Sequence, residues 1–390
     1  MSDMIKTKIS KLMPELVEIR RHLHMHPELG FEEVQTAKFV AEQLRKIGIC
    51  PTEGVGITGV VGLIKGENTG KTILIRADMD ALPIEEQTEV EYKSRTIGKM
   101  HACGHDGHMA ILLGAATILQ DMRSELNGNV KLVFQPCEES ITGAQAMIDD
   151  GVLDNPKVDA AIALHGWSGL PLGQVGLRSG VIMASADSFN LTITGKGGHA
   201  AYPQDCIDPI YIGSLIIQAL QGLISRESSI NDPAVVTIAK IDAGTSHNII
   251  PETAKLYGTV RTLNEAKRQR IKRRLEEVIV GITKAFNAKV EIEFLHNCPA
   301  TINDTRLMQF IEEVAFDSFG PNGVGAIQNP SMGAEDFSYF AQKVPSVMFH
   351  LGLGEHPICH NPSFDFVDET IPIGVEVFVK TALKYLRDST

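Results

Sequence analysis

Several features that would assign the chain to a class at once are missing from its sequence. No apolar stretch approaches the roughly 20 residues that a membrane-spanning helix requires. The N-terminal segment is charged and amphipathic, without the apolar core or cleavage site of a secretory signal. The six cysteines are widely spread, without the close pairs of a disulfide framework. These absences predict a cytoplasmic protein that contacts no membrane. In a reducing compartment, a cysteine beside histidines favours metal binding over a disulfide.

An excess of positive charge is also missing. The chain carries 36 Lys and Arg against 48 Asp and Glu, for a net charge of -12. Because phosphate binding requires a basic surface, this charge argues against a nucleic-acid partner. The basic run from Lys267 to Arg274 lies in a helical pattern and is interpreted as a solvated helix face. The 43% hydrophobic and 22% charged content is typical of a globular protein, and 390 residues favour two domains.

The hydrophobic pattern at both ends of the chain predicts alternating helices and strands. Strands rich in Val, Ile and Leu are expected at 57–64, 72–77, 129–135 and 158–164, with helices at 3–26, 106–123 and 143–150. The same character returns near the C-terminus, with a helix at 305–316, a strand at 346–352 and a helix at 370–386. Such strands between helices predict an α/β domain whose sheet is covered on both faces.

A different order separates these two parts. From residue 188 the pattern predicts a strand, a helix, two strands, a helix and a strand, at 188–195, 207–225, 234–241, 253–261, 264–286 and 289–295. This β-α-β-β-α-β order is that of a ferredoxin-like α+β domain. The sequence therefore predicts a discontinuous α/β domain, 1–183 and 297–390, into which residues 184–296 are inserted.

The segment His101–His108, HACGHDGH, concentrates three histidines, a cysteine and an aspartate in eight residues. Thiolate and imidazole suit zinc and other borderline transition ions. The alternative interpretation is a histidine-rich loop before a helix, with Asp106 as the N-cap of that helix. By itself, this segment does not decide between the two.

Ligand-capable side chains also follow the predicted strands. Glu138 and Glu139 come where the strand at 129–135 ends, and His165 ends the next strand. A further loop, His356–His360, comes after the strand at 346–352. Ligands of open α/β sheets gather at the carboxyl ends of strands. Taken alone, an adjacent glutamate pair is more often a solvated acidic turn, and a histidine at a strand end is more often a hydrogen-bonded core residue. Their shared position at strand ends favours one site.

A resemblance becomes specific once these motifs are taken in order. They are HPELGFEE (26–33), RADMDALP (76–83), HACGHDGH (101–108), CEES (137–140), the strand end at His165, GGHAAYP (197–203) and HNPSFD (360–365). Over nearly the whole chain, this series resembles the amidohydrolase branch of the aminoacylase/carboxypeptidase metallopeptidases. That branch includes N-acyl-amino-acid amidohydrolases, hippurate hydrolases and auxin-conjugate hydrolases.

The resemblance implies a centre of two divalent metal ions. The implied ligands are Cys103, His105, Glu139, His165 and His360, and the implied general base is Glu138. Two cations activate a water and polarise the scissile carbonyl, while Glu138 carries the proton to the departing amine. Thiolate favours zinc and carboxylate admits manganese, so the metal identity stays open. A carboxylate is expected to orient the ligand histidines, and Asp78, Asp80 and Asp106 are equal candidates for it.

The resemblance also implies functions for the inserted domain. It would form a homodimer, and His199 would reach the partner's active site to stabilise the tetrahedral oxyanion. Asn248 and Arg261 would bind the substrate, with Arg261 a natural fork for a carboxylate. Apart from the resemblance, these three are equally turn or salt-bridge residues.

The expected reaction is deacylation of N-acyl amino acids. A dipeptidase or carboxypeptidase is the alternative, because a peptide C-terminus presents the same amide and carboxylate. A non-catalytic metal-binding homologue is a third, disfavoured by the intact Glu138 and ligand set. The remaining histidines are given structural interpretations. His24 is assigned to packing and the dipole at the end of the first helix, and His108 to a structural or ligand-supporting role.

Overall fold

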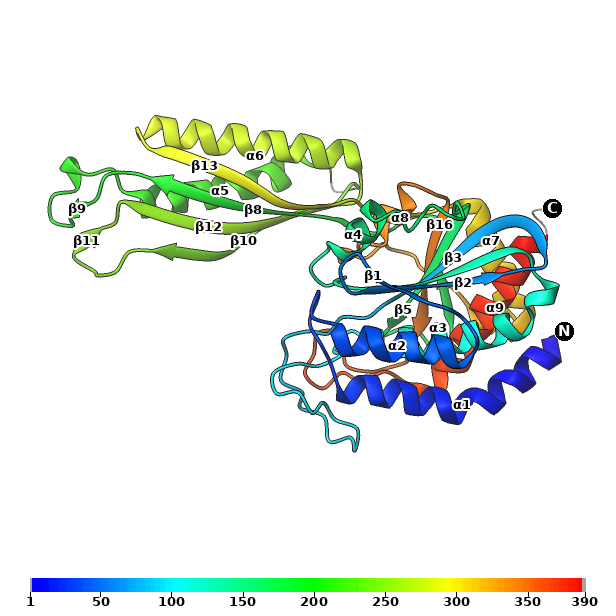
Figure 1. Ribbon diagram of the computed structural model, residues 1–390. Coiled ribbons are helices and arrows are strands. Elements are labelled where there is room, and N and C mark those ends of the chain that lie inside the picture. Colours follow the sequence, from blue (N-terminus) through cyan, green and yellow to red (C-terminus); the bar gives the residue numbers. More distant parts are fainter. Residues whose placement is uncertain (1, 230, 388–390) are drawn as a thin grey trace. The chain divides into compact units, whose positions relative to one another are not determined.

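The computed structural model describes residues 2–229 and 231–387. It divides into two compact units (Figure 1). Unit 1 comprises Met1–Ile182, Ile302–Asn329 and Asp336–Thr390, and unit 2 comprises Met183–Thr301 and Pro330–Glu335. The expected insertion at 184–296 ends five residues before the first segment of unit 2 does, at Thr301. The second segment of unit 2, Pro330–Glu335, was not predicted. Met1 and residues 388–390, in the expected first domain, lie outside the described residues.

Unit 1 contains an eight-stranded sheet whose centre is parallel. In spatial order its strands are β1 (Thr52–Val55), β2 (Gly59–Lys65), β4 (Asn127–Gln135), β3 (Asn68–Asp78), β5 (Ala160–Trp167), β16 (Ser346–Gly352), β6 (Val175–Leu177) and β15 (Val324–Ala326). Strands β4, β3, β5 and β16 pair in parallel, so their carboxyl ends meet at one edge. Antiparallel β2 flanks β4, and β6 flanks β16. The short strands β7 (Gly180–Met183) and β14 (Thr301–Asn303) lie near the unit boundaries in sequence.

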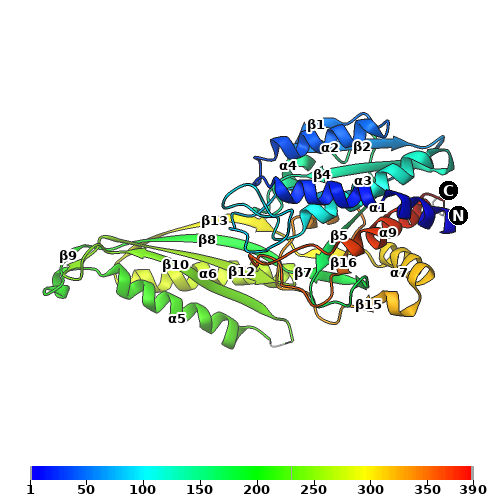
Figure 2. The same ribbon diagram turned by 90° about the horizontal axis from the view of Figure 1, so that it is seen from below.

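Helices cover both faces of this sheet, which confirms the expected α/β class. They are α1 (Ser2–Met25), α2 (Val34–Lys46), α3 (His105–Asp121), α4 (Gly143–Asp149), α7 (Thr305–Phe319), α8 (Ser338–Ala341) and α9 (Ile371–Arg387). On one face α3 and α9 pack on β3, and in both ribbon views α1 from the start of the chain lies beside α9 from its end (Figures 1 and 2). Helices α4 and α8 pack on β4 and β16 respectively.

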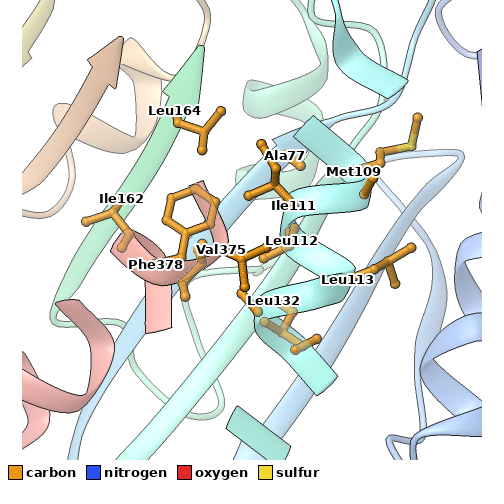
Figure 3. Packing of buried hydrophobic residues seen from close by; sticks show 14 of the residues in the cluster. Ala77, Met109, Ile111, Leu112, Leu113, Leu132, Ile162, Leu164, Val375 and Phe378 are labelled. Carbon is orange, nitrogen blue, oxygen red and sulfur yellow. The ribbon is translucent and has the colours of Figure 1, made fainter. Parts of the chain in front are cut away.

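The main core lies between the sheet and the α3–α9 pair. Alternate residues of β3 point to this side, including Ala77, and contribute to one cluster with Ile111, Val375 and Phe378 from the two helices (Figure 3). Phe378 is completely buried, and truncating such a phenylalanine costs about 3–5 kcal/mol. The core therefore fixes α3, whose first residue is His105, against the strand that ends at Asp78.

Unit 2 has the expected order of elements. It consists of β8 (Ser185–Thr194), α5 (Pro209–Glu227), β10 (Ala234–Ala243), β12 (Thr253–Thr262), α6 (Glu265–Ala285) and β13 (Lys289–Cys298). The antiparallel sheet has the order β10-β12-β8-β13, and α5 and α6 pack side by side on one face (Figure 2). The side chain of Asp208 caps the N-terminus of α5. Beyond the expected elements, β9 (Gly198–His199) and β11 (Ile249–Ile250) form a separate two-stranded ribbon.

Some details differ from the expected elements. Helix α2 was not predicted, although Val40, Ala41 and Leu44 form its buried face. The strand expected at 57–64 begins only at Gly59, because Ile57 has a positive φ and lies in a turn. Among the described residues, no helix has both the length and the apolar character needed to cross a membrane.

Candidate metal centre

The candidate site lies at the edge of unit 1 where the parallel strands end. Glu138 and Glu139 follow β4, and His165 lies near the end of β5, so all three reach this edge. Cys103 precedes α3 and His105 begins it, while His360 follows β16 in a loop. Between Cys103 and His105, Gly104 has φ 86°, and a Cβ there would approach the Phe366 ring to 2.8 Å. A glycine is therefore required to turn both side chains into the site.

The five expected metal ligands converge. Cys103 Sγ lies 3.4 Å from His165 Nε2, and His360 Nε2 lies 3.3 Å from Glu139 Oε2. The donor atoms of Cys103, His105 and His165 lie within 4.8 Å of one another, as do those of Cys103, Glu139 and His360. Two three-residue groups thus share one thiol. This arrangement matches a centre of two ions better than two independent sites.

The donor set also fits divalent cations chemically. Within the described part of the chain, His105 Nε2 and Glu139 Oε1 are buried and have no hydrogen-bond partner. A buried polar atom without a partner is costly, and a cation would satisfy both. Sulfur, imidazole nitrogen and carboxylate oxygen together suit zinc and similar ions. The residues therefore fit two divalent metal ions.

Protonation in the site is set by close neighbours. Burial lowers the pKa of His105, but the carboxylates of Asp78 and Asp80 outweigh it and raise that pKa well above its usual range. The hydrogen bond with Cys359, together with burial, raises the pKa of Cys103 well above its usual value. Metal binding must therefore displace protons from both side chains, which makes metal affinity fall as the pH falls.

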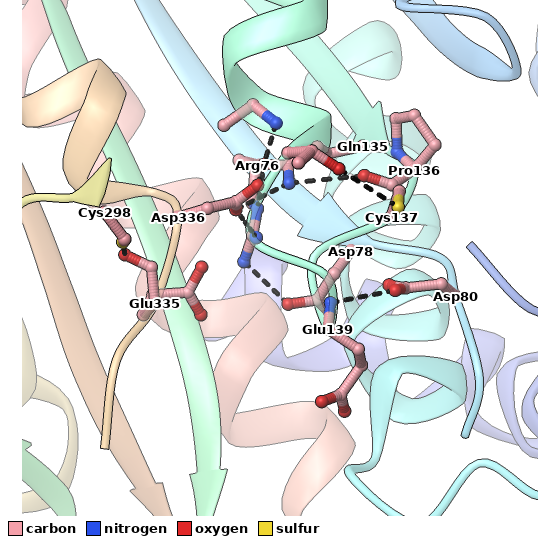
Figure 4. Close-up of polar contacts among 12 residues, drawn as sticks. Arg76, Asp78, Asp80, Gln135, Pro136, Cys137, Glu139, Cys298, Glu335 and Asp336 are labelled. Carbon is pink, nitrogen blue, oxygen red and sulfur yellow. Dashed lines mark hydrogen bonds and ion pairs between the residues drawn. The ribbon is translucent and has the colours of Figure 1, made fainter. Parts of the chain in front are cut away.

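Asp80 supports the ligands directly. Its backbone carbonyl accepts a hydrogen bond from His105 Nδ1 at 2.8 Å, which leaves Nε2 of that ring for a metal. Its side chain accepts the Glu139 amide at 2.9 Å (Figure 4). Asp80 thus orients two expected ligands, His105 at the start of α3 and Glu139 after β4.

Asp78 acts through His108. The Asp78 carboxylate accepts from His108 Nδ1 at 2.7 Å, and His108 Nε2 accepts the Gly166 amide at 2.9 Å. Gly166 follows His165, and its carbonyl in turn accepts from His165 Nδ1 at 2.7 Å. The sequence assigned His108 a structural or ligand-supporting role, and these contacts specify it. Asp78 and His108 hold the strand end that presents His165 Nε2.

Asp106 faces a different network. The sequence pattern offers Asp106 as an N-cap of the following helix. This alternative is wrong, because the N-cap position of α3 is Gly104 and no side chain caps the helix. Asp106 instead pairs with Arg20 and His24 of α1, at 2.9 and 2.8 Å. Burial opposes the charge on His24, but the bonds to Asp106 and Glu86 prevail and raise its pKa to about 9. These buried charges anchor α1 to the first turn of α3, a role for His24 that packing alone did not indicate.

Two further residues near the site were not predicted. Arg76 bonds to Asp78 and Gln135 at 2.6 and 2.8 Å and pairs with Asp336 at 3.2 Å, beneath the strand ends (Figure 4). Glu33 accepts the Cys137 amide at 2.8 Å and the Thr58 hydroxyl at 2.6 Å, and burial raises its pKa to about 7. Glu33 lies in the quoted HPELGFEE motif, but a single sequence does not reveal a contact with a loop over 100 residues away.

The three candidates in unit 2 do not lie together. Asn248 and His199 are neighbours on the β9–β11 ribbon, where the Ala200 amide bonds to the Asn248 carbonyl at 3.0 Å. Arg261 lies near the opposite end of β12 from Thr253, in register with Ala186. The eight steps from Thr253 to Arg261 correspond to about 26 Å of strand. One copy of unit 2 therefore cannot bring all three to one small molecule.

Comparison with known proteins gives consistent matches. The model of peptidase family M20/M25/M40 matches residues 74–384. An IAA-amino acid hydrolase ILR1-like 4 of Arabidopsis thaliana is 41% identical over 95% of this chain and 86% of its own. The N-acetylcysteine deacetylase of Bacillus subtilis is 39% identical over 94% and 96%. A solved dinuclear metal binding peptidase of family M20 from Bacillus subtilis has a TM-score of 0.83 and 35% identity, with coverage of 98% and 100%.

Replacing His108 tests the support for His165. We expect His108→Gln to lower metal affinity by about 10–100-fold, the usual effect of losing a residue that orients a metal ligand. The measurement is competition with a chelator of known affinity. His26→Ala, which removes an exposed histidine, serves as the control and should bind metal like the wild type. Equal affinities in all three proteins would contradict the role of the Asp78–His108 contact.

Proposed function

Because the chain belongs to peptidase family M20/M25/M40, we propose that this amide-bond hydrolase deacylates N-acyl amino acids, releasing a carboxylic acid and a free amino acid. One observation carries the proposal. The five expected ligands converge, and the carboxylate of Glu138 lies within 4.8 Å of donor atoms of both His105 and Glu139. An acid–base group beside a two-ion donor set is the arrangement that metal-assisted amide hydrolysis requires.

Glu138 is the proposed general base and acid. Bound divalent ions supply a water of lowered pKa and polarise the scissile carbonyl. Glu138, only 6% exposed, removes the proton from the attacking water, which then bonds to the carbonyl carbon. The protonated Glu138 delivers that proton to the amide nitrogen, so the C–N bond breaks with a neutral amine as leaving group. Cys103, His105, Glu139, His165 and His360 are the proposed ligands.

Zinc is the preferred metal and manganese the alternative. The thiol of Cys103 belongs to both donor groups, and thiolate selects zinc over manganese. We propose a reducing compartment, such as the cytoplasm, because Cys103 binds metal only while it is a free thiol. No disulfide joins any of the six cysteines, all of which lie in the described residues.

Unit 2 is the proposed dimerisation domain. The 26 Å between the two ends of β12 prevents His199 and Arg261 of one chain from contacting the same amino-acid-sized substrate. A second chain supplies the missing residue. Apolar side chains around the ribbon are about half exposed, including Ile210, Tyr211, Ile241 and Ile249. Such a surface is suited to burial against a second copy.

Hydrogen bonding in unit 2 suits the proposed roles. His199 Nδ1 accepts the Ala201 amide at 3.0 Å, so the neutral ring carries its proton on Nε2 and donates from there to an oxyanion. Asn248 Oδ1 accepts from the Ser246 hydroxyl at 2.6 Å, which leaves its amide N–H groups to donate to substrate. The Arg261 side chain forms no hydrogen bond or ion pair with the described residues, and its fork matches a carboxylate.

A substrate panel tests the proposed class. N-acetyl and N-benzoyl amino acids should have higher kcat/KM than dipeptides, and preference for dipeptides would favour the peptidase alternative. Converting the substrate carboxylate to an amide should lower kcat/KM by about 10–100-fold, the value of a charge-assisted hydrogen bond. Arg261→Ala should cause a similar loss with the carboxylate substrate and little further loss with the amide. Independent, additive losses would exclude an Arg261–carboxylate contact.

Glu138→Gln separates catalysis from metal binding. We expect kcat to fall by at least about 100-fold, the scale of general acid–base catalysis, with metal content unchanged. The neighbouring Glu139→Gln is the matched control, and it should lose metal as well as activity. Elemental analysis and steady-state kinetics give both readouts. Full activity in Glu138→Gln would remove Glu138 from the mechanism.

Mixed dimers test whether His199 acts on the partner chain. Glu138→Gln and His199→Ala subunits with different tags are co-expressed, and the doubly tagged dimer is isolated. If His199 acts across the dimer, one of its two sites has both functional residues, so the mixed dimer should recover about half of wild-type activity. Each homodimer should be nearly inactive. If the mixed dimer is as inactive as they are, His199 acts within its own chain.

A further inference from the structure

A second thiol lies beside the proposed ligand Cys103. The His360 amide donates to the Ala102 carbonyl at 2.8 Å, which holds the segment containing Cys359 against the segment containing Cys103. The pKa of the Cys103 thiol is raised and that of the Cys359 thiol lowered by the other, so the two side chains lie close together although 256 positions separate them in the sequence. Both are free thiols in this structure. The fold therefore brings two thiols next to each other at the candidate metal centre.

Cys359 is not placed as a metal ligand. None of the donor groups found among the described residues includes it, whereas Cys103 belongs to two of them. Without Cys103, one group retains only His105 and His165, and the other only Glu139 and His360. A change at the Cys103 sulfur thus removes a donor from both groups at once. Any effect of Cys359 on metal binding would act through that sulfur.

We propose that Cys103 and Cys359 form a reversible disulfide when a peroxide reaches the site, and that this modification releases the metal ions. The inference rests on the proposed role of Cys103 as a metal ligand. It adds a regulatory modification that hydrolysis itself does not need. Loss of the thiolate leaves two donors in each group, fewer than the three protein ligands usual for catalytic zinc.

The chemistry balances with hydrogen peroxide as the oxidant. Cys359 is partly exposed, whereas Cys103 is 7% exposed, so peroxide reaches Cys359 first. The Cys359 sulfur takes one peroxide oxygen to become a sulfenic acid, and water leaves. The Cys103 sulfur then attacks the Cys359 sulfur, forming the S–S bond and breaking the S–O bond, and a second water leaves. Two thiols are oxidised, and both peroxide oxygens are reduced to water.

The test uses full-length protein and follows the disulfide and the metal separately. After treatment with one equivalent of hydrogen peroxide, the metal-free wild type should be about 2 Da lighter, and its digest should contain the Cys103 peptide linked to the Cys359 peptide. Zinc-loaded wild type should release zinc to a chromophoric chelator as this linked peptide accumulates. Dithiothreitol followed by zinc should restore full metal content.

Matched variants test whether zinc release under peroxide requires the Cys359 thiol. Cys359→Ser and Cys359→Ala should load zinc when reduced, form no linked peptide, and release zinc at least about tenfold more slowly under peroxide, because no resolving thiol is present. Cys50→Ser, which removes an exposed thiol, should behave like the wild type. Zinc release from both Cys359 variants at the wild-type rate would overturn the proposal. A linked peptide involving another cysteine instead would overturn it too.

Different results would contradict the ligand role of Cys103 and the Cys103–Cys359 disulfide. If reduced Cys103→Ser binds zinc as tightly as the wild type, the proposed ligand role of Cys103 is wrong, whatever peroxide does. If reduced wild type binds zinc through Cys103 but no Cys103–Cys359 peptide forms, the metal centre stands and the disulfide is excluded. Mass spectrometry of metal-free protein decides the second question without reference to activity.

Discussion

The candidate site depends on one geometric constraint, the common edge at which four buried parallel strands end. Strands β4, β3, β5 and β16 are apolar and covered on both faces, so charged side chains gather where the backbone leaves the sheet. Glu138 and Glu139 follow β4, His165 lies near the end of β5, and His360 follows β16. These residues meet at this edge, with the start of α3 beside it. Because the core fixes the strands and α3, it also fixes the positions of the donor atoms.

This preorganisation requires a second layer of polar contacts. His105 and His165 each donate from Nδ1 to a backbone carbonyl, which leaves Nε2 for coordination. Arg76 offsets the buried negative charge of Asp78, while Asp78 and Asp80 in turn support ligands. Buried charges without such partners would cost several kcal/mol each. The layer therefore explains why acidic residues exist so deep in the unit, and why the ligand rings have one orientation.

The thiol of Cys103 belongs to both candidate donor groups, and the same thiol is the proposed point of oxidation. Sharing one donor between two groups keeps the pair compact, but it makes both groups depend on a single sulfur. Cys359 lies next to that sulfur because the loop after β16 also carries His360. The proposed sensitivity to oxidation would thus arise from the same loop that carries the candidate ligand His360. In unit 2, the proposed substrate contacts depend in a similar way on a second chain. The length of β12 separates His199 from Arg261, and one substrate would have to contact both.

The amino-acid sequence alone predicted the element types, the α/β class, the ferredoxin-like order and the five candidate ligands. Hydrophobic periodicity and strand-end chemistry are local properties, and the ordered motifs carry the family resemblance. Tertiary structure decided what depends on contacts between distant segments. It showed that Asp78 and Asp80 contact the candidate ligands whereas Asp106 contacts α1. It also determined the hydrogen-bond partners of His24, Glu33 and His108, and it placed Cys359 beside Cys103. No local pattern encodes these pairings, because a hydrogen bond across dozens or hundreds of residues exists only after the core has fixed both segments.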